Sequence, residues 1–196
     1  MEKRKLSGYD LNSQPILYDV DIFPDRRGYF KEVYNEETFM KKTGLNKIDF
    51  IQDNVSMSIK GVIRGMHFQW EHPQDKLITV LKGYIVDKII DIRPESPNFG
   101  KIYTYHLSQY NRNVLFVPRG FAHGFMACED DTLVMYKVSS AHRIANDEGS
   151  IYFNDKDLNL GWLEESSAHI KEHELIVSDR DKSAMSWKDF VDMVKE

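Results

Sequence analysis

Residues 52–76 have the sequence QDNVSMSIKGVIRGMHFQWEHPQDK, and the rest of the chain is organised around them. Their polar side chains fall among apolar residues and glycines, which is typical of strands that carry polar groups into a cavity. An imidazole, a guanidinium and an ammonium group this close in sequence are costly to desolvate unless an anion balances them. The stretch therefore predicts a binding site for an anionic ligand, which we expect to carry phosphates. The polar positions are Gln52, Asn54, Arg64, His67 and Lys76.

Short strand-like runs extend outward from this stretch, from residue 48 to residue 138. They are rich in β-branched and aromatic residues and are separated by Gly, Pro, Asn and Ser. Strands and helices do not alternate, which disfavours a Rossmann or TIM-barrel architecture. The pattern predicts an all-β fold, an antiparallel sandwich or barrel of the jelly-roll kind. The runs are residues 48–54, 61–69, 76–81, 83–93, 102–107, 113–118 and 132–138.

Smaller elements are expected before the sheets. Residues 15–34 predict a hairpin, because turn-forming residues including Gly28 interrupt two strand-like runs. Residues 36–44 predict a short helix with Asn35 as its N-cap and Gly44 as its stop.

The C-terminal part predicts a further strand and turn over residues 151–162 and a charged surface segment over residues 163–174. A capping box from Ser186 to Asp189 predicts a C-terminal helix at about residues 184–195, which we expect to serve packing. No linker divides the chain, so we expect one domain over residues 1–196, with a short N-terminal arm.

The 196 residues carry a formal net charge of -5, with basic and acidic residues interspersed. This disfavours non-specific binding to nucleic acid or to a membrane surface. The N-terminal sequence MEKRKLSGYDL lacks the apolar run of a signal peptide, and no stretch approaches the roughly 18 apolar residues of a membrane span. Cys128 is the only cysteine, which excludes an internal disulfide. We expect a cytoplasmic protein.

The segment VPRGFAHGF places Pro118, Gly120 and His123 in a P-x-G-x-x-H spacing that resembles the second sequence signature of the cupin barrel. In metal-binding cupins that histidine is a ligand, and an earlier strand supplies an H-x-H pair. Here the earlier strand has His67 followed by Phe and Gln, so we predict no catalytic metal. His72, in the loop that follows, is the one nearby imidazole that leaves this prediction open.

Proton transfer is the chemistry that remains for a histidine, a lysine and a tyrosine. His67 is a candidate base, which a carboxylate would orient, and Lys76 could stabilise an enolate oxygen. Tyr136 could return a proton from the opposite face. Each residue alone has an ordinary structural explanation, and only the combination favours a site. Candidate carboxylates for the base are Asp87, Asp91, Asp179 and Asp181.

The chain resembles the nucleotide-sugar epimerases typified by dTDP-4-dehydrorhamnose 3,5-epimerase, over almost everything from residue 16 to residue 181. This resemblance implies a cupin-type jelly roll, a homodimer and no cofactor. It also implies epimerisation of a 4-keto-6-deoxyhexose attached to a nucleoside diphosphate, for deoxysugar and surface polysaccharide synthesis. The motifs that carry it are DRRGYFKE (25–32), FIQDNVSMSIKGVIRGMHFQ (50–69), QDKL (74–77), VDKIIDIRPESPNFGK (86–101), LSQYN (107–111), VPRGFAHGF (117–125), MYK (135–137) and LIVSDRD (175–181).

The resemblance also implies roles for single residues. His67 is similar to the family's general base and Asp181 to its orienting partner. Tyr136 is similar to the proton donor and Lys76 to the residue beside the keto oxygen. The implied nucleotide- or sugar-contacting positions are Arg27, Glu32, Gln52, Asp53, Asn54, Arg64, His123, Asp147 and Arg180.

The chain departs from the family after the MYK strand. Residues 140–143 are Ser, Ala, His and Arg where a tyrosine pair and a proline are usual. Asp147 stands in place of a glutamate and Arg180 in place of a lysine, and residues 163–174 form an added segment. Three alternatives therefore stay open: an epimerase that inverts a single carbon, one that uses a CDP- or GDP-linked sugar, and a catalytically silent cupin that binds a sugar nucleotide.

Overall fold

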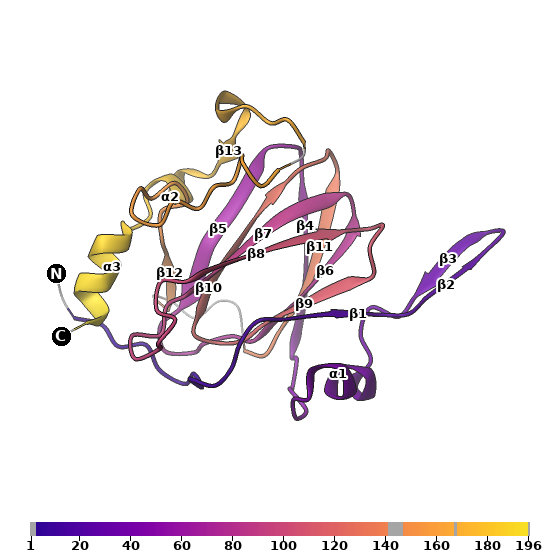
Figure 1. Ribbon diagram of the computed structural model, residues 1–196, viewed down its shortest axis with the longest axis horizontal. Coiled ribbons are helices and arrows are strands. Elements are labelled where there is room, and N and C mark those ends of the chain that lie inside the picture. The colour runs from indigo at the N-terminus through magenta and orange to yellow at the C-terminus, as the bar shows by residue number, and fades with distance from the viewer. Residues whose placement is uncertain (1–2, 141–146, 167, 196) are drawn as a thin grey trace.

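Two β-sheets face each other in the computed structural model, which describes residues 3–140, 147–166 and 168–195 (Figure 1). The first sheet has the order β1-β9-β6-β11-β4, and the second has the order β12-β5-β10-β7-β8 with β13 added beside β5. Only β13 pairs in parallel with its neighbour; the other described ladders are antiparallel. The all-β jelly-roll prediction is confirmed.

The described strands are short. Those of the first sheet are β1 (Ile16–Asp19), β4 (Gln52–Ser58), β6 (Lys76–Lys82), β9 (Asn113–Val117) and β11 (Thr132–Val138). Those of the second sheet are β5 (Val62–Gln69), β7 (Tyr84–Asp91), β8 (Ile102–Ser108), β10 (Phe121–Ala127), β12 (Glu148–Ser150) and β13 (Ile176–Val177).

The space between the sheets holds one apolar core, which includes Ile78, Ile89, Leu115 and Phe125. A second core lies where the C-terminal segment covers the second sheet, and it contains Trp70 and Phe190. Ile170 is buried in this second core and anchors the charged segment around it to the body, while residues 171–174 are exposed to solvent. The jelly roll therefore carries a packed outer layer on one face.

Several described elements lie outside the two facing sheets, among them a hairpin, two longer helices, the single-turn helix α2 (Asp179–Lys182) and the 3-10 helix η1 (Glu172–Glu174). The hairpin β2 (Ile22–Asp25) and β3 (Gly28–Lys31) projects away from the body (Figure 1). Helix α1 (Glu36–Thr43) has the predicted caps: the Asn35 side chain accepts a hydrogen bond from the Thr38 amide, and Gly44 is left-handed. The C-terminal helix α3 (Trp187–Val194) lies beside the N-terminal end of the chain.

The structure differs from the predicted elements in several places. The strand expected from residue 48 begins at Gln52, because a hydrogen bond from the Phe50 amide to the Ile48 carbonyl turns the chain before it. Strand β10 was not predicted, since glycines interrupt its pattern. Residues 151–162 form turns after a single bridge at Ile151, and the C-terminal helix is shorter than residues 184–195 because it starts after its cap.

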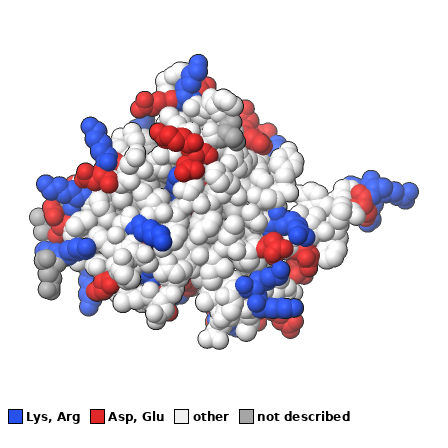
Figure 2. All heavy atoms as spheres, in the orientation of Figure 1, with Lys and Arg blue, Asp and Glu red and all other residues white. Residues whose placement is uncertain are grey.

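Charged side chains of both signs are interspersed on the face shown in Figure 2. Among the helices of the described residues, none has the length and apolar composition that crossing a bilayer requires.

Phe190 tests whether α3 serves packing. Its ring is fully buried and lies within 5.8 Å, between centroids, of Phe68, Trp70 and Trp187. We expect Phe190→Ala to lower the free energy of unfolding by about 3–5 kcal/mol, because it removes a large side chain from the core. Urea denaturation measures this. Asp192→Ala, at an exposed position of the same helix, is the control and should change stability by less than about 0.5 kcal/mol; an equal loss in both variants would contradict the packing role.

Candidate active site

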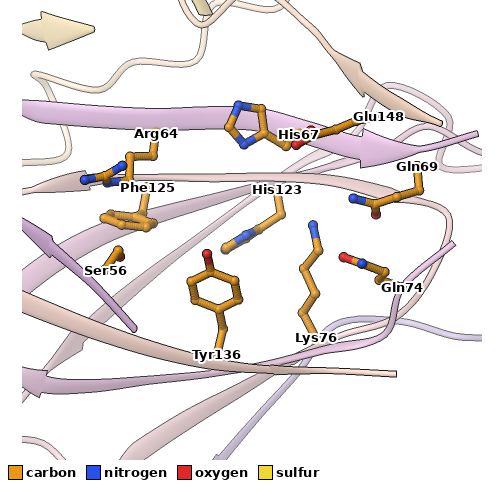
Figure 3. A pocket seen from close by; sticks show the side chains of 10 residues that line it. All are labelled: Ser56, Arg64, His67, Gln69, Gln74, Lys76, His123, Phe125, Tyr136 and Glu148. Carbon is orange, nitrogen blue, oxygen red and sulfur yellow. The ribbon is translucent and has the colours of Figure 1, made fainter. Parts of the chain in front are cut away.

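A pocket opens between the two sheets, and polar side chains from both of them point into it (Figure 3). One wall comes from β5, β10 and β12 of the second sheet, and the other from β4, β6 and β11 of the first. The residues that line it are Ser56, Arg64, His67, Gln69, Gln74, Lys76, His123, Phe125, Tyr136 and Glu148.

His67 forms a pair with a buried carboxylate. The Asp181 Oδ1 atom lies 2.7 Å from His67 Nε2, and Asp181 Oδ2 accepts a hydrogen bond of 3.4 Å from the Gly65 amide. Burial raises the pKa of Asp181, but the hydrogen bond and charge of His67, together with the Gly65 and Ser178 groups, lower it overall. An ionised Asp181 accepts a hydrogen bond from the Nε2–H group of His67. Nδ1 is then the ring nitrogen that can take a proton.

Gly65 allows β5 and β10 to approach closely enough to form this wall. Its φ is +128°, and a Cβ atom there would lie 2.5 Å from the Gly124 Cα and 2.8 Å from the His123 carbonyl oxygen. Any other residue would push the strands apart. The contact places His67 directly opposite His123 in the ladder.

Lys76 projects from the first strand position of β6 toward the middle of the pocket (Figure 3). Burial lowers its pKa to about 8, and the negative charges of Glu148 and Asp87 partly oppose that shift. Within the described residues its ammonium group has no hydrogen bond or ion pair. A cation held this way can serve an anionic group that enters the pocket.

Tyr136 points into the pocket from β11, on the sheet opposite His67 (Figure 3). Burial raises the pKa of its phenol, while the charge of Arg64 lowers it. The pocket therefore has an imidazole on one wall, a phenol on the other, and an ammonium group in reach of the space between them.

His123 has its own carboxylate. Its Nε2 atom lies 2.8 Å from Asp87 Oδ2, and Asp87 is fully buried. Burial raises the pKa of Asp87, and the charges of His123 and Lys76 oppose this. Two candidate partners of His67 are thus engaged elsewhere: Asp87 with His123, and Asp91 with Arg93 at 2.5 Å.

The whole barrel matches one protein family. The family model described as dTDP-4-dehydrorhamnose 3,5-epimerase matches residues 13–189. The chain belongs to this family. A curated dTDP-4-dehydrorhamnose 3,5-epimerase from Methanothermobacter thermautotrophicus is 40% identical over 173 residues, which is 88% of each chain.

Solved structures of this family share the fold. The dTDP-4-dehydrorhamnose 3,5-epimerase of Elizabethkingia anophelis superimposes with a TM-score of 0.78 at 40% identity, over 94% of this chain and 97% of that one. A Legionella pneumophila dTDP-6-deoxy-D-glucose-3,5-epimerase in complex with dTDP-4-keto-L-rhamnose gives a TM-score of 0.78 at 31% identity, over 93% of this chain and 90% of that one.

Three predicted site residues of this epimerase-family chain lie away from the pocket. Arg27 sits in the turn of the projecting hairpin, where it pairs with Asp25, and Glu32 follows that hairpin. Asp53 is on the outer face of β4 and pairs with Lys137 at 2.7 Å. These three residues lie outside the pocket lining, and their predicted contact with a nucleotide or sugar stays a prediction.

Four others lie beside the pocket without lining it. Gln52 and Asn54 are on the inner face of β4 and bond to each other at 2.7 Å. The Asp147 carboxylate accepts hydrogen bonds from the Glu71 and His72 amides and so holds that loop, and its predicted contact with a nucleotide or sugar stays a prediction. Arg180 forms an ion pair of 2.9 Å with Glu148.

Glu148 is the most informative residue that sequence reasoning missed. It faces the pocket from β12, while the preceding Asp147 serves the loop. The signal was the adjacent acidic pair, since alternate residues of a strand face opposite sides and only one of the two can point inward. Residues 141–146 of the departing segment lie outside the described residues. The other missed lining residues are Ser56, Gln69, Gln74 and Phe125.

Across residues 3–140, 147–166 and 168–195, no group of three or more His, Cys, Asp and Glu side chains is arranged to hold a metal ion. His72 lies 3.5 Å from Asp147, its partner in the loop. The absence of a catalytic metal stays a prediction.

The buried Lys76 makes stability depend on pH. Below pH 8 the lysine is charged in the folded and unfolded states, so the cost of burying the charge is fully present. Between pH 8 and 10.5 the unfolded chain binds the proton more tightly, so the free energy of unfolding rises with pH, by up to about 3 kcal/mol.

Lys76→Met removes this dependence. We expect the variant to be more stable than the wild type near pH 8, with the difference shrinking toward pH 10.5 as the wild-type lysine loses its charge. Urea denaturation of both proteins across this range measures the difference, in which other titrating groups cancel. A difference that stays constant with pH would show that the lysine is not buried as a cation.

Proposed function

We propose that this chain is an isomerase that inverts carbon 3 and carbon 5 of a dTDP-linked 4-keto-6-deoxyhexose without a cofactor. The membership of the epimerase family supports the reaction class, and the Legionella relative with bound dTDP-4-keto-L-rhamnose supports the substrate class. The observation that carries the proposal is the placement of His67 with Asp181 on one wall of the pocket and Tyr136 on the other.

The first step is removal of a proton from a carbon beside the keto group. His67 accepts this proton at Nδ1 while Asp181 holds the ring through Nε2, and the C–H electron pair becomes part of an enolate. Negative charge develops on the keto oxygen at carbon 4. The Lys76 ammonium group stabilises it, in the way an oxyanion hole does.

The second step returns a proton to the opposite face of the same carbon. Tyr136 donates its phenolic proton, the enolate collapses to the ketone, and the centre is inverted. His67 has then gained one proton and Tyr136 has lost one, so exchange with water restores both. The same set of groups can act at the second carbon on the other side of the keto group.

Arg64 is the residue we assign to the diphosphate. Its guanidinium is fixed by the Ser58 hydroxyl and the Met57 carbonyl, both at 3.0 Å, and this prepares it for an anion. Glu148 and the two glutamines of the lining are suited to the sugar hydroxyls. Cys128 is buried, which is compatible with the reducing cytoplasm that we infer for the protein.

A homodimer is also part of the proposal. The outer face of the edge strand β4 exposes Val55 and Met57, and the residues beside it expose Ile51 and Ile59. The projecting hairpin likewise exposes aromatic side chains. A second copy that covers these surfaces would remove apolar area from water and protect the sheet edge. The hairpin would then bring Arg27 to the second copy, where it could contact substrate.

Met57→Glu tests the dimer, because a buried unpaired carboxylate would be costly at the interface. We expect light scattering after gel filtration to give about twice 23.0 kDa for the wild type and about 23.0 kDa for the variant. Lys188→Glu changes an exposed residue on α3, at the opposite end of the molecule from the projecting hairpin (Figure 1), and should leave the dimer intact. A monomeric wild type would contradict the proposal.

Solvent-deuterium exchange separates the two proton-transfer roles. In deuterium oxide, His67→Ala should abolish both deuterium incorporation and inversion, because no enolate forms. Tyr136→Phe should still incorporate deuterium while inverting about a hundred to ten thousand times more slowly, because the enolate is recaptured from the side it left. Proton NMR of the sugar measures both.

His106→Ala and Tyr103→Phe are matched controls on β8, outside the pocket lining, and should leave exchange and inversion unchanged. Exchange at the wild-type rate in the His67 variant would exclude this base. Exchange at one carbon only would favour a single-centre epimerase, and tight binding without any exchange would favour the silent cupin. Preferential turnover of CDP- or GDP-linked sugars would contradict the proposed dTDP-linked substrate.

A further inference from the structure

The helix that carries Asp181 is a single turn. Helix α2 (Asp179–Lys182) has four residues, and a serine closes each end. Ser178 Oγ accepts a hydrogen bond of 3.1 Å from the Asp181 amide. Ser183 Oγ donates to the Asp179 and Arg180 carbonyls at 2.9 and 3.1 Å. Since one helical turn is unfavourable by itself in water, these caps contribute much of what keeps it folded.

The chain on either side of α2 is fixed to two different strands. Before the helix, β13 pairs with Val62 and Ile63 of β5. After it, the Met185 amide donates to the Ser150 carbonyl at 3.2 Å, beside β12. Residues 176–185 therefore cross from the strand that carries His67 to the strand that carries Glu148, and α2 lies between the two attachments.

Residues of α2 bind the side chains of both His67 and Glu148. Asp181 binds His67 at 2.7 Å, and the neighbouring Arg180 binds Glu148 at 2.9 Å. A small displacement of this one turn would move the partners of both side chains together.

We propose that Ser178 is a positioning residue for the His67–Asp181 pair. Its hydroxyl accepts a hydrogen bond from the backbone amide of Asp181, so the residue that Ser178 holds is the same residue whose carboxylate orients the imidazole. Without the hydroxyl, Asp181 loses its fixed position, and His67 is no longer held with the proton on Nε2. This inference rests on the proposed function of His67 as the base.

Ser186 provides a matched control within the same chain. It caps α3 in the same manner, with its hydroxyl accepting a hydrogen bond of 3.0 Å from the Asp189 amide. Helix α3 contributes no residue to the pocket lining. Loss of a helix cap alone should therefore lower stability in both variants, but only the Ser178 change should alter the tautomer of His67.

The experiment compares Ser178→Ala, Ser178→Thr and Ser186→Ala by steady-state kinetics and by nitrogen-15 NMR of His67. We expect Ser178→Ala to lower kcat roughly 10- to 100-fold with KM unchanged, since misplacement rather than lost substrate contact is the cause. Its NMR spectrum should show a mixture of imidazole tautomers in place of the single Nε2-protonated form. Ser178→Thr, which retains a capping hydroxyl, should restore both readouts, and Ser186→Ala should change neither.

The same change in an Asp181→Asn background decides whether the effect passes through the carboxylate. There, Ser178→Ala should lower kcat no further. An equal fold-loss in both backgrounds, or an unchanged tautomer in Ser178→Ala, would overturn the proposal. If Ser178→Ala does not fold, Ser178→Gly removes the hydroxyl at a smaller cost to the cap and is read by the same criteria. A wild type without turnover would refute the proposed function, while the NMR arm would still decide the role of Ser178.

Discussion

Strands β5 and β10 meet backbone to backbone at Gly65 and Gly124, and the pocket depends on that contact. It sets His67 and His123 side by side on one wall. It also brings the Gly65 amide to Asp181, so the same glycine that lets the strands approach supplies a donor to the carboxylate. One close approach thus fixes two imidazoles and one of their anionic partners, and the facing sheet needs only to present Lys76 and Tyr136 across the gap.

Carboxylates are distributed around the basic side chains of this poorly solvated pocket. Asp181 lies behind His67, Asp87 lies behind His123, and Glu148 acts on Lys76 from the side. None of these carboxylates neutralises Lys76 by direct pairing within the described residues. The arrangement leaves positive charge directed at the space where a ligand would sit, which is the electrostatic requirement for an enolate and a diphosphate.

Sequence reasoning predicted the features that depend on local chemistry. The caps of α1 and α3 are the predicted ones, because they follow from residues three positions apart. It failed where a face had to be chosen: Asp147 was selected and Glu148 was missed, since a three-residue strand gives too little alternation to show which side is inward. The position of Arg27 was also out of reach, because the direction in which a hairpin leaves the body does not follow from the hairpin's own sequence.

The pairing of His67 with Asp181 joins residues 114 positions apart. During synthesis His67 is made long before Asp181, so the strands of the barrel can pair around an imidazole that still lacks its carboxylate. Residues 176–185 supply both the Asp181–His67 bond and the Arg180–Glu148 ion pair, so neither interaction forms until this segment has packed against the second sheet. Among the pocket residues and their partners named above, Arg180 and Asp181 are therefore synthesised last.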